Sequence, residues 1–446
     1  MKKIILIIPL LISLSGMAQE KKWDLNTCID YAHRHNLQLK QSQLDIRQAE
    51  NNKLNALGSF LPEVNANASG TWNSGLTQNI TTGILENQTT FGLSGSINSG
   101  MPLFNGFRNR YQYKKSLLEI LSAQYRYADM QNNIDIQIAG AYLQILLNKE
   151  NYESAKVQLE NSIKQKERTA EMIQAGVLPS GDLADAEAQI TNDNLQVIQA
   201  ENAYELSKLN LAQLLELNDF KNFEIDENIE GIKPTGDLLQ SEAENLFQEA
   251  LKNNQKYKQS EIQEQIAVYQ IKVARSGQLP SLSAFANINT RYSDREKFAF
   301  GGMPTPADPF WNQVKDNYGI SYGLNLRIPV FNGFNVRNQI RNARISAEKM
   351  QINTENTRKN LKNDIYKMHR DMVAAYQSMK AAEANLKAQR KAYDYAMEKF
   401  KVGMLNIFDL NNLKTKYSKA ENQYINAKYQ YYLKVKILEY TISSGK

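Results

Sequence analysis

The tetrapeptide Phe104-Asn105-Gly106-Phe107 recurs unchanged as Phe331-Asn332-Gly333-Phe334, 227 residues further along the chain. Other pairs share this spacing: Gly92 with Gly319, Asn98 with Asn325, Pro102 with Pro329, Gly176 with Gly403 and Asp182 with Asp409. Before them the spacing is 218, as between Pro62 and Pro280, so the second copy has a loop that is nine residues longer. Each copy far exceeds the period of about 20 to 50 residues that marks solenoid repeats. The chain is therefore one long unit written twice, over residues 19–215 and 242–446.

The N-terminus predicts export. Lys2 and Lys3 precede an apolar run over residues 4–14, and Gly16-Met17-Ala18 offers small residues at a cleavage site. This is the pattern of a secretory signal peptide, here over residues 1–18. The alternative is a membrane anchor, but an anchor needs about 20 apolar residues and this run is shorter.

Charge and cysteine content argue against several classes of protein. Loss of Lys2 and Lys3 with the signal lowers the net charge from +6 to +4, and the remaining charge is spread evenly. A nucleic-acid partner would instead require a clustered basic footprint. Cys28 is the only cysteine, so no internal disulfide is expected. It also lies too far past the cleavage site to carry an N-terminal lipid.

Two stretches predict very long helices. Residues 108–175 hold no proline and one glycine, and residues 335–402 hold neither, which suits uninterrupted helix. At a rise of 1.5 Å per residue, each helix would be roughly 100 Å long. Apolar residues recur in alternating steps of four and three, the heptad seam of a coiled coil. In the second copy the seam comprises Leu361, Ile365, Met368, Met372, Ala375, Met379, Ala382, Leu386, Tyr393, Ala396 and Phe400. In the first it comprises Ile134, Ile138, Ala141, Ile145, Tyr152, Ala155, Leu159 and Ile173.

A short turn and a returning helix follow each long helix. The turns begin at Gly176 and Gly403, and a glycine just past a helix end supplies the left-handed cap. The returning helices are expected over residues 182–215 and 409–441, so each copy should contain an antiparallel helical hairpin. The seam of the first returning helix comprises Leu183, Ala186, Ile190, Val197, Ala200, Tyr204 and Leu211. Residues 216–241, richer in Asp, Gly and Pro, are interpreted as the connector between copies and as a belt around the helices.

Between the prolines the pattern changes to period 2, over residues 62–103 and 280–330. In the second copy apolar residues alternate with small or polar ones, which is typical of a half-buried strand. The apolar set is Tyr318, Ile320, Tyr322, Leu324, Leu326, Ile328 and Val330. Two β-hairpins are expected, with strands long enough for the roughly 9 to 11 residues that cross a bilayer when tilted. Trp72, Phe300, Phe310 and Trp311 are candidate interfacial aromatics.

Strands in lipid cannot leave an open edge, because each unpaired N–H or C=O group in hydrocarbon costs several kcal/mol. Four strands cannot close alone, since known membrane barrels begin at about eight strands. Several copies of the chain would therefore pool their hairpins. The alternative is an ordinary soluble hairpin on a helical domain, but that arrangement would leave two equivalent apolar faces uncovered.

The order of these features resembles the TolC-like outer membrane efflux protein family. Leu61-Pro62 and Leu279-Pro280 stand where helix passes to strand, and the segments from Pro102 to Gly106 and from Pro329 to Gly333 stand where strand returns to helix. Proline removes a donor from the strand ladder and can end a strand, and Asn-Gly favours the turn that follows. The family usually has a second glycine where Phe107 and Phe334 stand, a departure expected to alter local packing more than fold.

The resemblance implies a mainly α fold with a small membrane β part. Three copies would form one twelve-stranded outer-membrane barrel, continuous with a periplasmic α-helical barrel. It further implies a passive exit channel of an efflux or type I secretion system, whose tip meets a periplasmic adaptor protein and an inner-membrane transporter. The alternative from another class is an exported coiled-coil scaffold or adhesin without a pore.

The resemblance also implies a gate at the tip. Asp409 matches a family aspartate that follows the second turn, Asn412 stands where another can occur, and Asp182 and Asp185 are the first-copy equivalents. The family's gate-locking arginine position falls at Leu405, so that lock is absent here or built differently. Helix capping is the alternative role for Asp182 and Asp409, because carboxylates near a helix start satisfy free N–H groups.

The sequence indicates no enzyme or cofactor chemistry. His33 and His35 are two residues apart, which places them on different sides of a helix, and His369 stands alone on a long helix. A metal site is therefore not expected. Neither a nucleophile elbow, nor a phosphate loop, nor a paired-cysteine motif is present in the sequence.

Overall fold

The computed structural model describes residues 22–78, 84–217, 223–226, 237–294, 297–298 and 304–443. The predicted signal peptide at residues 1–18, Phe300 and most of the connector at residues 216–241 lie outside these described residues. The chain divides into two compact units. A helical unit comprises residues 1–40, 129–254 and 362–446, and a sheet unit comprises residues 41–128 and 255–361.

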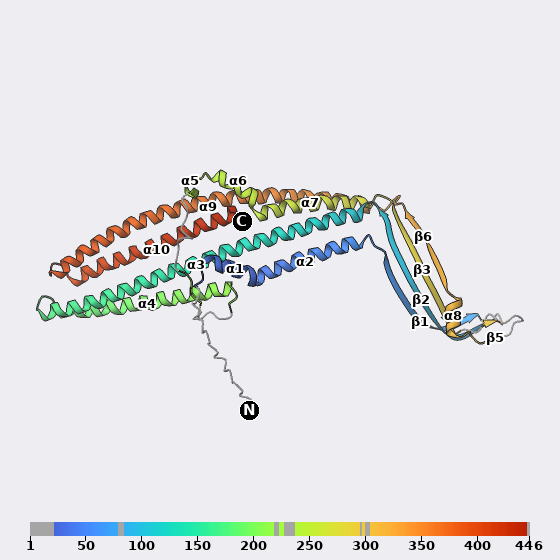
Figure 1. Ribbon diagram of the computed structural model, residues 1–446, viewed down its shortest axis with the longest axis horizontal. Helices are drawn as coiled ribbons and strands as arrows, with labels where there is room; N and C mark the ends of the chain where they lie inside the picture. Colours follow the sequence, from blue (N-terminus) through green and yellow to red (C-terminus); the bar gives the residue numbers. More distant parts are fainter. Residues whose placement is uncertain are drawn as a thin grey trace, which may run out of the picture. The chain divides into compact units, whose positions relative to one another are not determined.

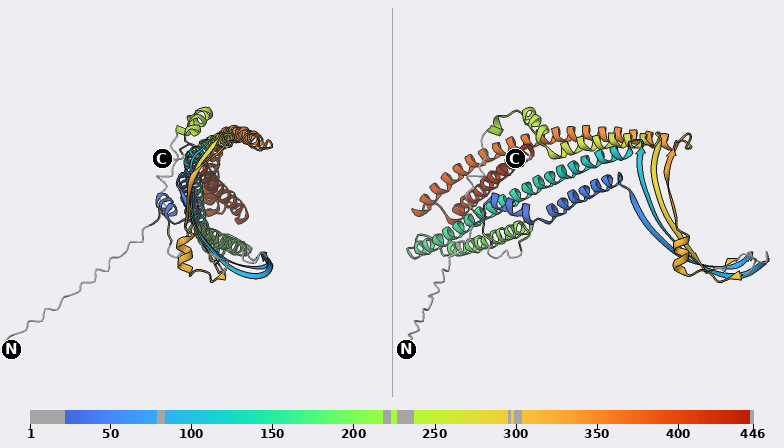
Figure 2. Two further views of the ribbon diagram at one scale, coloured as in Figure 1. Left: turned by 90° about the vertical axis from the view of Figure 1, so that its right-hand side faces the viewer. Right: turned by 45° about the vertical axis from the view of Figure 1, so that its right-hand side comes forward.

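The sheet unit holds one four-stranded antiparallel sheet. Its order is β1 (Glu63–Gln78), β2 (Leu85–Asn105), β3 (Ser281–Ser293) and β6 (Gly319–Arg327), as Figure 1 shows. The pairing of β2 with β3 joins the hairpin of the first copy to that of the second, and the strands curve together (Figure 2). The mainly α fold with a small sheet is thus confirmed.

The longer loop of the second copy contains structure of its own. The short strands β4 (Lys297–Phe298) and β5 (Pro304–Thr305) and the helix α8 (Phe310–Asp316) lie between β3 and β6 in the chain. The strand expected from Tyr318 to Val330 is shorter, since only Gly319–Arg327 pairs with β3.

Four helices enter and leave the sheet. α2 (Leu37–Gly58) precedes β1 and α7 (Gln255–Ser276) precedes β3, while α3 (Arg108–Gln174) follows β2 and α9 (Asn335–Lys401) follows β6. Within the sheet unit, α7 packs on α9 through a small apolar cluster of Ala274, Ile340 and Ala343. The alanines allow the two helices to approach closely.

The prolines at the junctions do not all act alike. Pro62 and Pro280 directly precede their strands, and Pro329 follows the end of β6. The prediction that proline ends the strand is wrong for Pro102, because β2 continues to Asn105. The pairing of β2 with β3 shifts register between Pro102 and Phe104. A β-bulge here accommodates a residue that cannot donate to the ladder.

The helical unit contains the two predicted hairpins. α4 (Gly181–Leu214) lies alongside α3, and α10 (Ile407–Ser443) lies alongside α9 (Figure 1). The short helices α1 (Leu25–His35), α5 (Asp237–Gln240) and α6 (Ala243–Asn253) complete the unit. The opening helix of each copy is broken at an asparagine with extended backbone, Asn36 in the first and Asn254 in the second. Asn36 Oδ1 accepts the N–H groups of Gln38 and Leu39.

The heptad seams are buried as predicted. Every seam residue of α9 from Ile365 to Phe400 is buried or half-buried, whereas most residues beside them are exposed. Met372 and Phe400 are fully buried. The opposite helix faces are polar, and within the described ranges no helix is both long and apolar enough to cross a bilayer.

Candidate functional site

The sheet has one apolar face and one polar face, and strand register keeps both continuous. Trp72 lies opposite Phe91, Leu93 opposite Tyr292, and Ile288 opposite Ile320. Side chains alternate along a strand, so these pairs place all four apolar sets on one side. That side carries Val64, Ala66, Ala68 and Trp72 of β1, Phe91, Leu93, Ile97 and Met101 of β2, Ala284, Ala286, Ile288 and Tyr292 of β3, and Ile320, Tyr322, Leu324 and Leu326 of β6.

The other face is rich in amides, hydroxyls and glycines. It carries Asn65, Asn67, Ser69, Thr71 and Asn73 of β1, Gly92, Ser94, Ser96 and Asn98 of β2, Asn287, Asn289 and Arg291 of β3, and Ser321, Asn325 and Arg327 of β6. The hydroxyls of Ser69 and Ser94 are hydrogen-bonded across two strands at 2.7 Å. Phe285 is an exception, and its ring covers Gly323, where a Cβ would lie 3.0 Å from it. This face suits contact with water.

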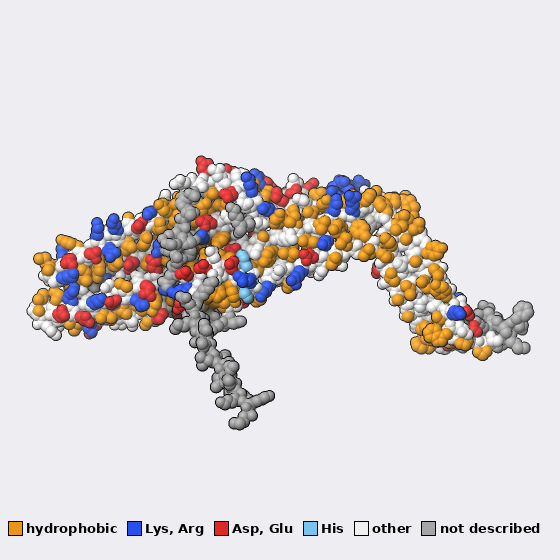
Figure 3. All heavy atoms as spheres, viewed as in Figure 1, with side chains coloured by type: hydrophobic (Ala, Val, Ile, Leu, Met, Phe, Trp, Pro, Cys, Tyr) orange, Lys and Arg blue, Asp and Glu red, His pale blue; other side chains and the backbone are white. Residues whose placement is uncertain are grey.

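The apolar face is uncovered over much of its area. Tyr322 is 84% exposed and Leu324 is 66% exposed, and Figure 3 shows hydrophobic side chains gathered over the strands. Soluble monomers rarely expose so large an apolar surface. The sheet also ends at β1 and β6, whose outer ladder groups are free to pair with another strand.

Aromatic rings gather where strands give way to helices. Phe104 packs edge-on against Phe107 with ring centroids 5.1 Å apart, and Phe331 packs against Phe334 in the same way at 5.7 Å. Phe107 and Phe334 have φ values of 66° and 63°. This left-handed region costs a residue with a Cβ roughly 1 to 2 kcal/mol. The backbone therefore keeps the conformation that would suit the glycine absent from both positions.

The turns that follow the C-terminal ends of α3 and α9 have matching geometry. Gly176 and Gly403 have φ values of 71° and 73°, as the predicted left-handed caps require. The N–H of Val177 donates to the Met172 carbonyl oxygen at 2.9 Å, which closes the longer hydrogen bond of a Schellman cap. The second turn repeats this bond from Met404.

An apolar cluster brings the two turns together. Its buried residues include Phe400 and Ile407, and Met172 from the end of α3 and Leu178 from the first turn pack against them. Leu405 also belongs to this cluster. The position that the family gives to a gate-locking arginine is therefore part of an apolar contact in this chain.

The predicted tip residues lie close to the starts of the returning helices. Asp182 is in the first turn of α4 and Asp409 is in the first turn of α10. Asp182 is half-buried, while Asp185, Asp409 and Asn412 are exposed. The contacts found among the described residues join none of these four to another.

Asn406 caps α10. Its Oδ1 accepts the backbone N–H of Asp409 at 2.7 Å, and its Nδ2 donates to the Asp409 carboxylate at 2.9 Å. Asp409 thus supports the cap by orienting Asn406, and does not itself accept a backbone N–H in this arrangement. Sequence reasoning identified the right turn of helix but missed its capping residue.

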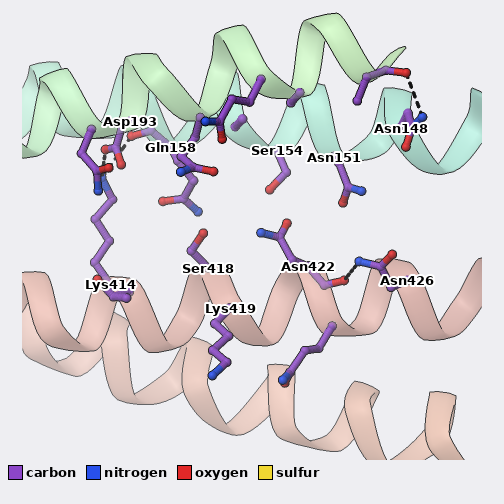
Figure 4. Close-up of a pocket in the computed structure, with 18 of the residues that line it drawn as sticks. Asn148, Asn151, Ser154, Gln158, Asp193, Lys414, Ser418, Lys419, Asn422 and Asn426 are labelled. Carbon is purple, nitrogen blue, oxygen red and sulfur yellow. Dashed lines mark hydrogen bonds and ion pairs between the residues drawn. The ribbon is translucent and has the colours of Figure 1, made fainter. Parts of the chain in front are cut away.

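A polar cavity of about 750 Å³ lies in the helical unit between α3 and α4 on one side and α10 on the other (Figure 4). Asn151 and Ser154 from α3 point toward Asn422 from α10. Asn148 Nδ2 donates to the Ala203 carbonyl oxygen at 2.9 Å. Because amides and hydroxyls dominate its lining, the cavity suits water.

A buried ion pair closes one end of this cavity. Lys414 Nζ lies 2.6 Å from Asp193 Oδ2, and the two side chains are only 7% and 10% exposed. Lys414 also donates to the Gln158 carbonyl oxygen at 3.2 Å and to the Ser162 hydroxyl, while Gln189 Nε2 donates to Asp193 Oδ1 at 2.8 Å. Buried charges persist only when paired and hydrogen-bonded. This network therefore fastens α10 to α3 and α4.

Sequence reasoning missed this pair, although the heptad pattern contains a signal for it. The seam of α4 steps from Ile190 to Val197, and Asp193 stands at the heptad position between them. Ser162 likewise stands at the next heptad position after Leu159 in α3. A polar residue at a seam position is a candidate for a buried network that sets register.

The helix α1 is held to α3 by a second ion pair. His33 Nε2 lies 2.7 Å from Asp135 Oδ1, and this hydrogen bond raises the pKa of His33 above its usual 6.5. Cys28 on α1 is fully buried, and burial raises the pKa of its thiol to about 12. Within the described part of the chain, no group of three or more His, Cys, Asp or Glu residues is placed to hold a metal ion.

Comparison with solved structures finds the same fold in bacterial outer-membrane channels. The outer membrane protein VceC of Vibrio cholerae superposes with a TM-score of 0.75 and 15% identity, over 94% of this chain and 96% of VceC. The CmeC outer membrane channel of Campylobacter jejuni gives a TM-score of 0.73 and 19% identity, over 94% of this chain and 86% of CmeC.

Sequence comparison agrees. The outer membrane protein TolC of Vibrio cholerae is 24% identical over 233 residues, a match that covers 50% of this chain and 48% of that relative, or about half of its length. The model of the outer membrane efflux protein family matches residues 28–216 and 246–439, which cover most of both copies of the repeat. The chain therefore belongs to the outer membrane efflux protein family.

Proposed function

We propose that this chain is the outer-membrane exit channel of a tripartite efflux or type I secretion system and works as a homotrimer. The observation that carries the proposal is the sheet whose apolar and polar faces stay in register over four strands while both of its edges are unpaired. Three copies would supply twelve strands, a number within the range of closed membrane barrels. Closure would pair the outer groups of β1 with those of β6 in the next copy, as hydrocarbon requires.

In this arrangement the apolar face contacts lipid and the polar face lines a water-filled lumen. The helical unit extends into the periplasm, and the turns at Gly176 and Gly403 form the tip that meets a periplasmic adaptor protein and an inner-membrane transporter. Of the connector, residues 223–226 lie beside the residues that precede α1, because the Trp23 N–H donates to the Glu224 carbonyl oxygen at 3.0 Å. The chain is a passive conduit and has no catalytic role.

Channel recordings test the proposal directly. The purified protein should migrate as a trimer on gels before heating and as a monomer afterwards, and it should produce stepwise conductance in a planar lipid bilayer. Heat-denatured protein is the control. A coiled-coil scaffold or adhesin could form a heat-sensitive oligomer but would give no conductance, so an absent current would favour that alternative.

We also propose that the charges of Asp182 and Asp409 restrict ion flow at the tip. Asp182→Asn with Asp409→Asn keeps side-chain hydrogen bonding and removes the charge, so conductance should rise or block by cations should weaken. Asn406→Ala is the matched control, since it removes the α10 cap and keeps both carboxylates. If the control changes conductance as much as the charge-removing pair does, the two aspartates act only through the helix ends.

A further inference from the structure

Helix α8 stands in for strand pairing at one edge of the sheet. β6 pairs with β3 only as far as Asn289, whereas β3 continues to Ser293. Beyond that point Asn317 Nδ2 donates to the Arg291 carbonyl oxygen at 2.9 Å. Gln313 accepts the Ser293 N–H at 3.0 Å and donates to the Ser293 carbonyl oxygen at 2.8 Å. Side chains at α8 thus hydrogen-bond to main-chain groups of β3 beyond the end of its pairing with β6.

The helix packs on the apolar face of the sheet. Thr290 and Tyr292 belong to that face, since Tyr292 lies opposite Leu93. The Thr290 hydroxyl donates to the Val314 carbonyl oxygen at 2.7 Å, and the Tyr292 ring lies 5.2 Å from that of Phe310. α8 is therefore on the side that the proposed channel turns toward lipid.

A chain of aromatic rings connects α8 to the strands. Trp72 and Phe91 are 4.6 Å apart between ring centroids, Phe91 and Tyr292 are 6.4 Å apart, and Phe310 and Trp311 are 5.0 Å apart. Together with the contact between Tyr292 and Phe310, these rings form an unbroken belt from β1 through β2 and β3 to α8. Trp311 ends the belt and is 76% exposed.

The apolar face becomes more polar beyond this belt of rings. On the apolar face of β1, every residue from Val64 to Trp72 is apolar or glycine. This stretch spans nine residues of the strand, close to the roughly 9 to 11 that cross a bilayer. Just beyond the belt, the Thr89 hydroxyl donates to that of Ser74 at 3.0 Å on the same face. Aromatic belts of this kind mark the boundary between hydrocarbon and water in membrane barrels.

We propose that α8 is an interfacial helix that lies at the boundary between acyl chains and headgroups of the outer leaflet, with the ring of Trp311 in contact with lipid. The inference rests on the proposed function, because it requires the apolar face of the sheet to be in a bilayer. An indole ring favours this boundary, where its body contacts acyl chains and its N–H reaches water. Lys315 and Asp316 are exposed and suit the headgroup side.

Fluorescence of single-tryptophan variants tests the placement. The chain has three tryptophans, so Trp23→Phe with Trp72→Phe leaves Trp311 as the reporter. In vesicles of phosphatidylcholine brominated on its acyl chains, Trp311 should lose most of its emission when bromine is near the headgroup. It should lose less when bromine is deep in the chain, and iodide in the water should quench it weakly.

Two other results would overturn the inference. Strong quenching by iodide with none by bromine would put Trp311 in water, and quenching by neither would bury it against a second copy of the chain. Trp23→Phe with Trp311→Phe leaves Trp72 and is the matched control. If Trp72 is quenched by bromine and the channel conducts while Trp311 is not quenched, the α8 inference fails and the channel proposal stands. If neither tryptophan is quenched and no current appears, both fail.

Discussion

Gly106 and Gly333 occupy equivalent places in the two copies, but only Gly106 is crowded. Their φ values are 65° and 60°. A Cβ on Gly106 would lie 2.5 Å from the Ser276 carbonyl oxygen, whereas nothing lies within 4 Å of one on Gly333. The positive φ of both glycines can be predicted from the Asn-Gly motif, since a turn of this kind favours positive φ. The crowding around Gly106 cannot be predicted from the motif, because it depends on how closely the end of α7 lies to the end of β2.

This difference predicts unequal effects of the same substitution. Gly333→Ala should lower the free energy of unfolding by about 1 kcal/mol through left-handed strain alone. Gly106→Ala should cost about 1 to 3 kcal/mol more, because backbone must move to admit the methyl group. Urea unfolding followed by circular dichroism measures both. Equal costs would contradict the account of the Ser276 contact.

The buried pair of Lys414 and Asp193 should be costly to break from one side. Lys414→Met leaves Asp193 without its partner and should destabilise the protein by about 3 to 5 kcal/mol. Lys414→Met combined with Asp193→Leu should cost less, because no buried charge remains. Lys401→Met is the control, since Lys401 and Glu398 form a pair that is 41% and 69% exposed and such pairs contribute about 0 to 1 kcal/mol. Equal losses for Lys414→Met and Lys401→Met in the same urea assay would argue against the buried network.

At the scale of elements, docking of α1 should depend on pH. The hydrogen bond to Asp135 raises the folded-state pKa of His33 above 6.5. A raised pKa means that the stabilisation is complete below the unfolded value of 6.5 and is lost as pH rises through the folded value. Amide hydrogen exchange in α1 should therefore be slower at about pH 6 than at about pH 8, after correction for intrinsic rates.

Two variants separate this effect from general pH dependence. His33→Gln should remove the difference in protection between the two pH values. His35→Gln should retain it, because His35 stacks on Tyr31 and its ring nitrogen bonds to the Tyr31 carbonyl oxygen. Persistence of the difference in His33→Gln would assign it to another group.

Periodicity predicted the long helices and strands well, because the same pattern of buried and exposed positions recurs many times along each of them. α9 begins at Asn335 as expected, and α10 begins at Ile407, two residues before the expected start. Local interruptions were harder to predict. Pro102 remains inside β2, where the pairing with β3 shifts register directly after it, whereas β6 ends before Pro329. The helix α8 has seven residues, too few to show a helical period, and its place is set by contacts with β3.

The two faces of β6 predict opposite responses to the same charge. Leu324→Arg places a cation on the apolar face and should cost about 2 to 4 kcal/mol near the middle of a bilayer. Asn325→Arg places it on the polar face and should leave trimer formation nearly unchanged. Recovery of heat-sensitive trimer from membranes measures both. Equal recovery of the two variants would argue against a lipid-facing side.

At the scale of the whole molecule, the duplicated pattern and the open strand edges together predict assembly from several copies. The sequence motifs did not reveal which side chains face across neighbouring strands, since register depends on pairing over long distances. The structure supplies that register and shows that the apolar sets of all four strands coincide. The cargo of the proposed channel leaves no such mark in the sequence, because a wide, water-filled lumen would make few specific contacts.

Cysteine scanning along β6 in a conducting bilayer tests the two-faced sheet most directly. The native thiol of Cys28 is fully buried, so background labelling should be small. A charged, membrane-impermeant methanethiosulfonate should reduce the current through Ser321→Cys and Asn325→Cys and leave Tyr322→Cys and Leu324→Cys unchanged. Equal reaction at all four positions, or reaction at Tyr322→Cys and Leu324→Cys alone, would contradict a barrel with its polar face toward the lumen.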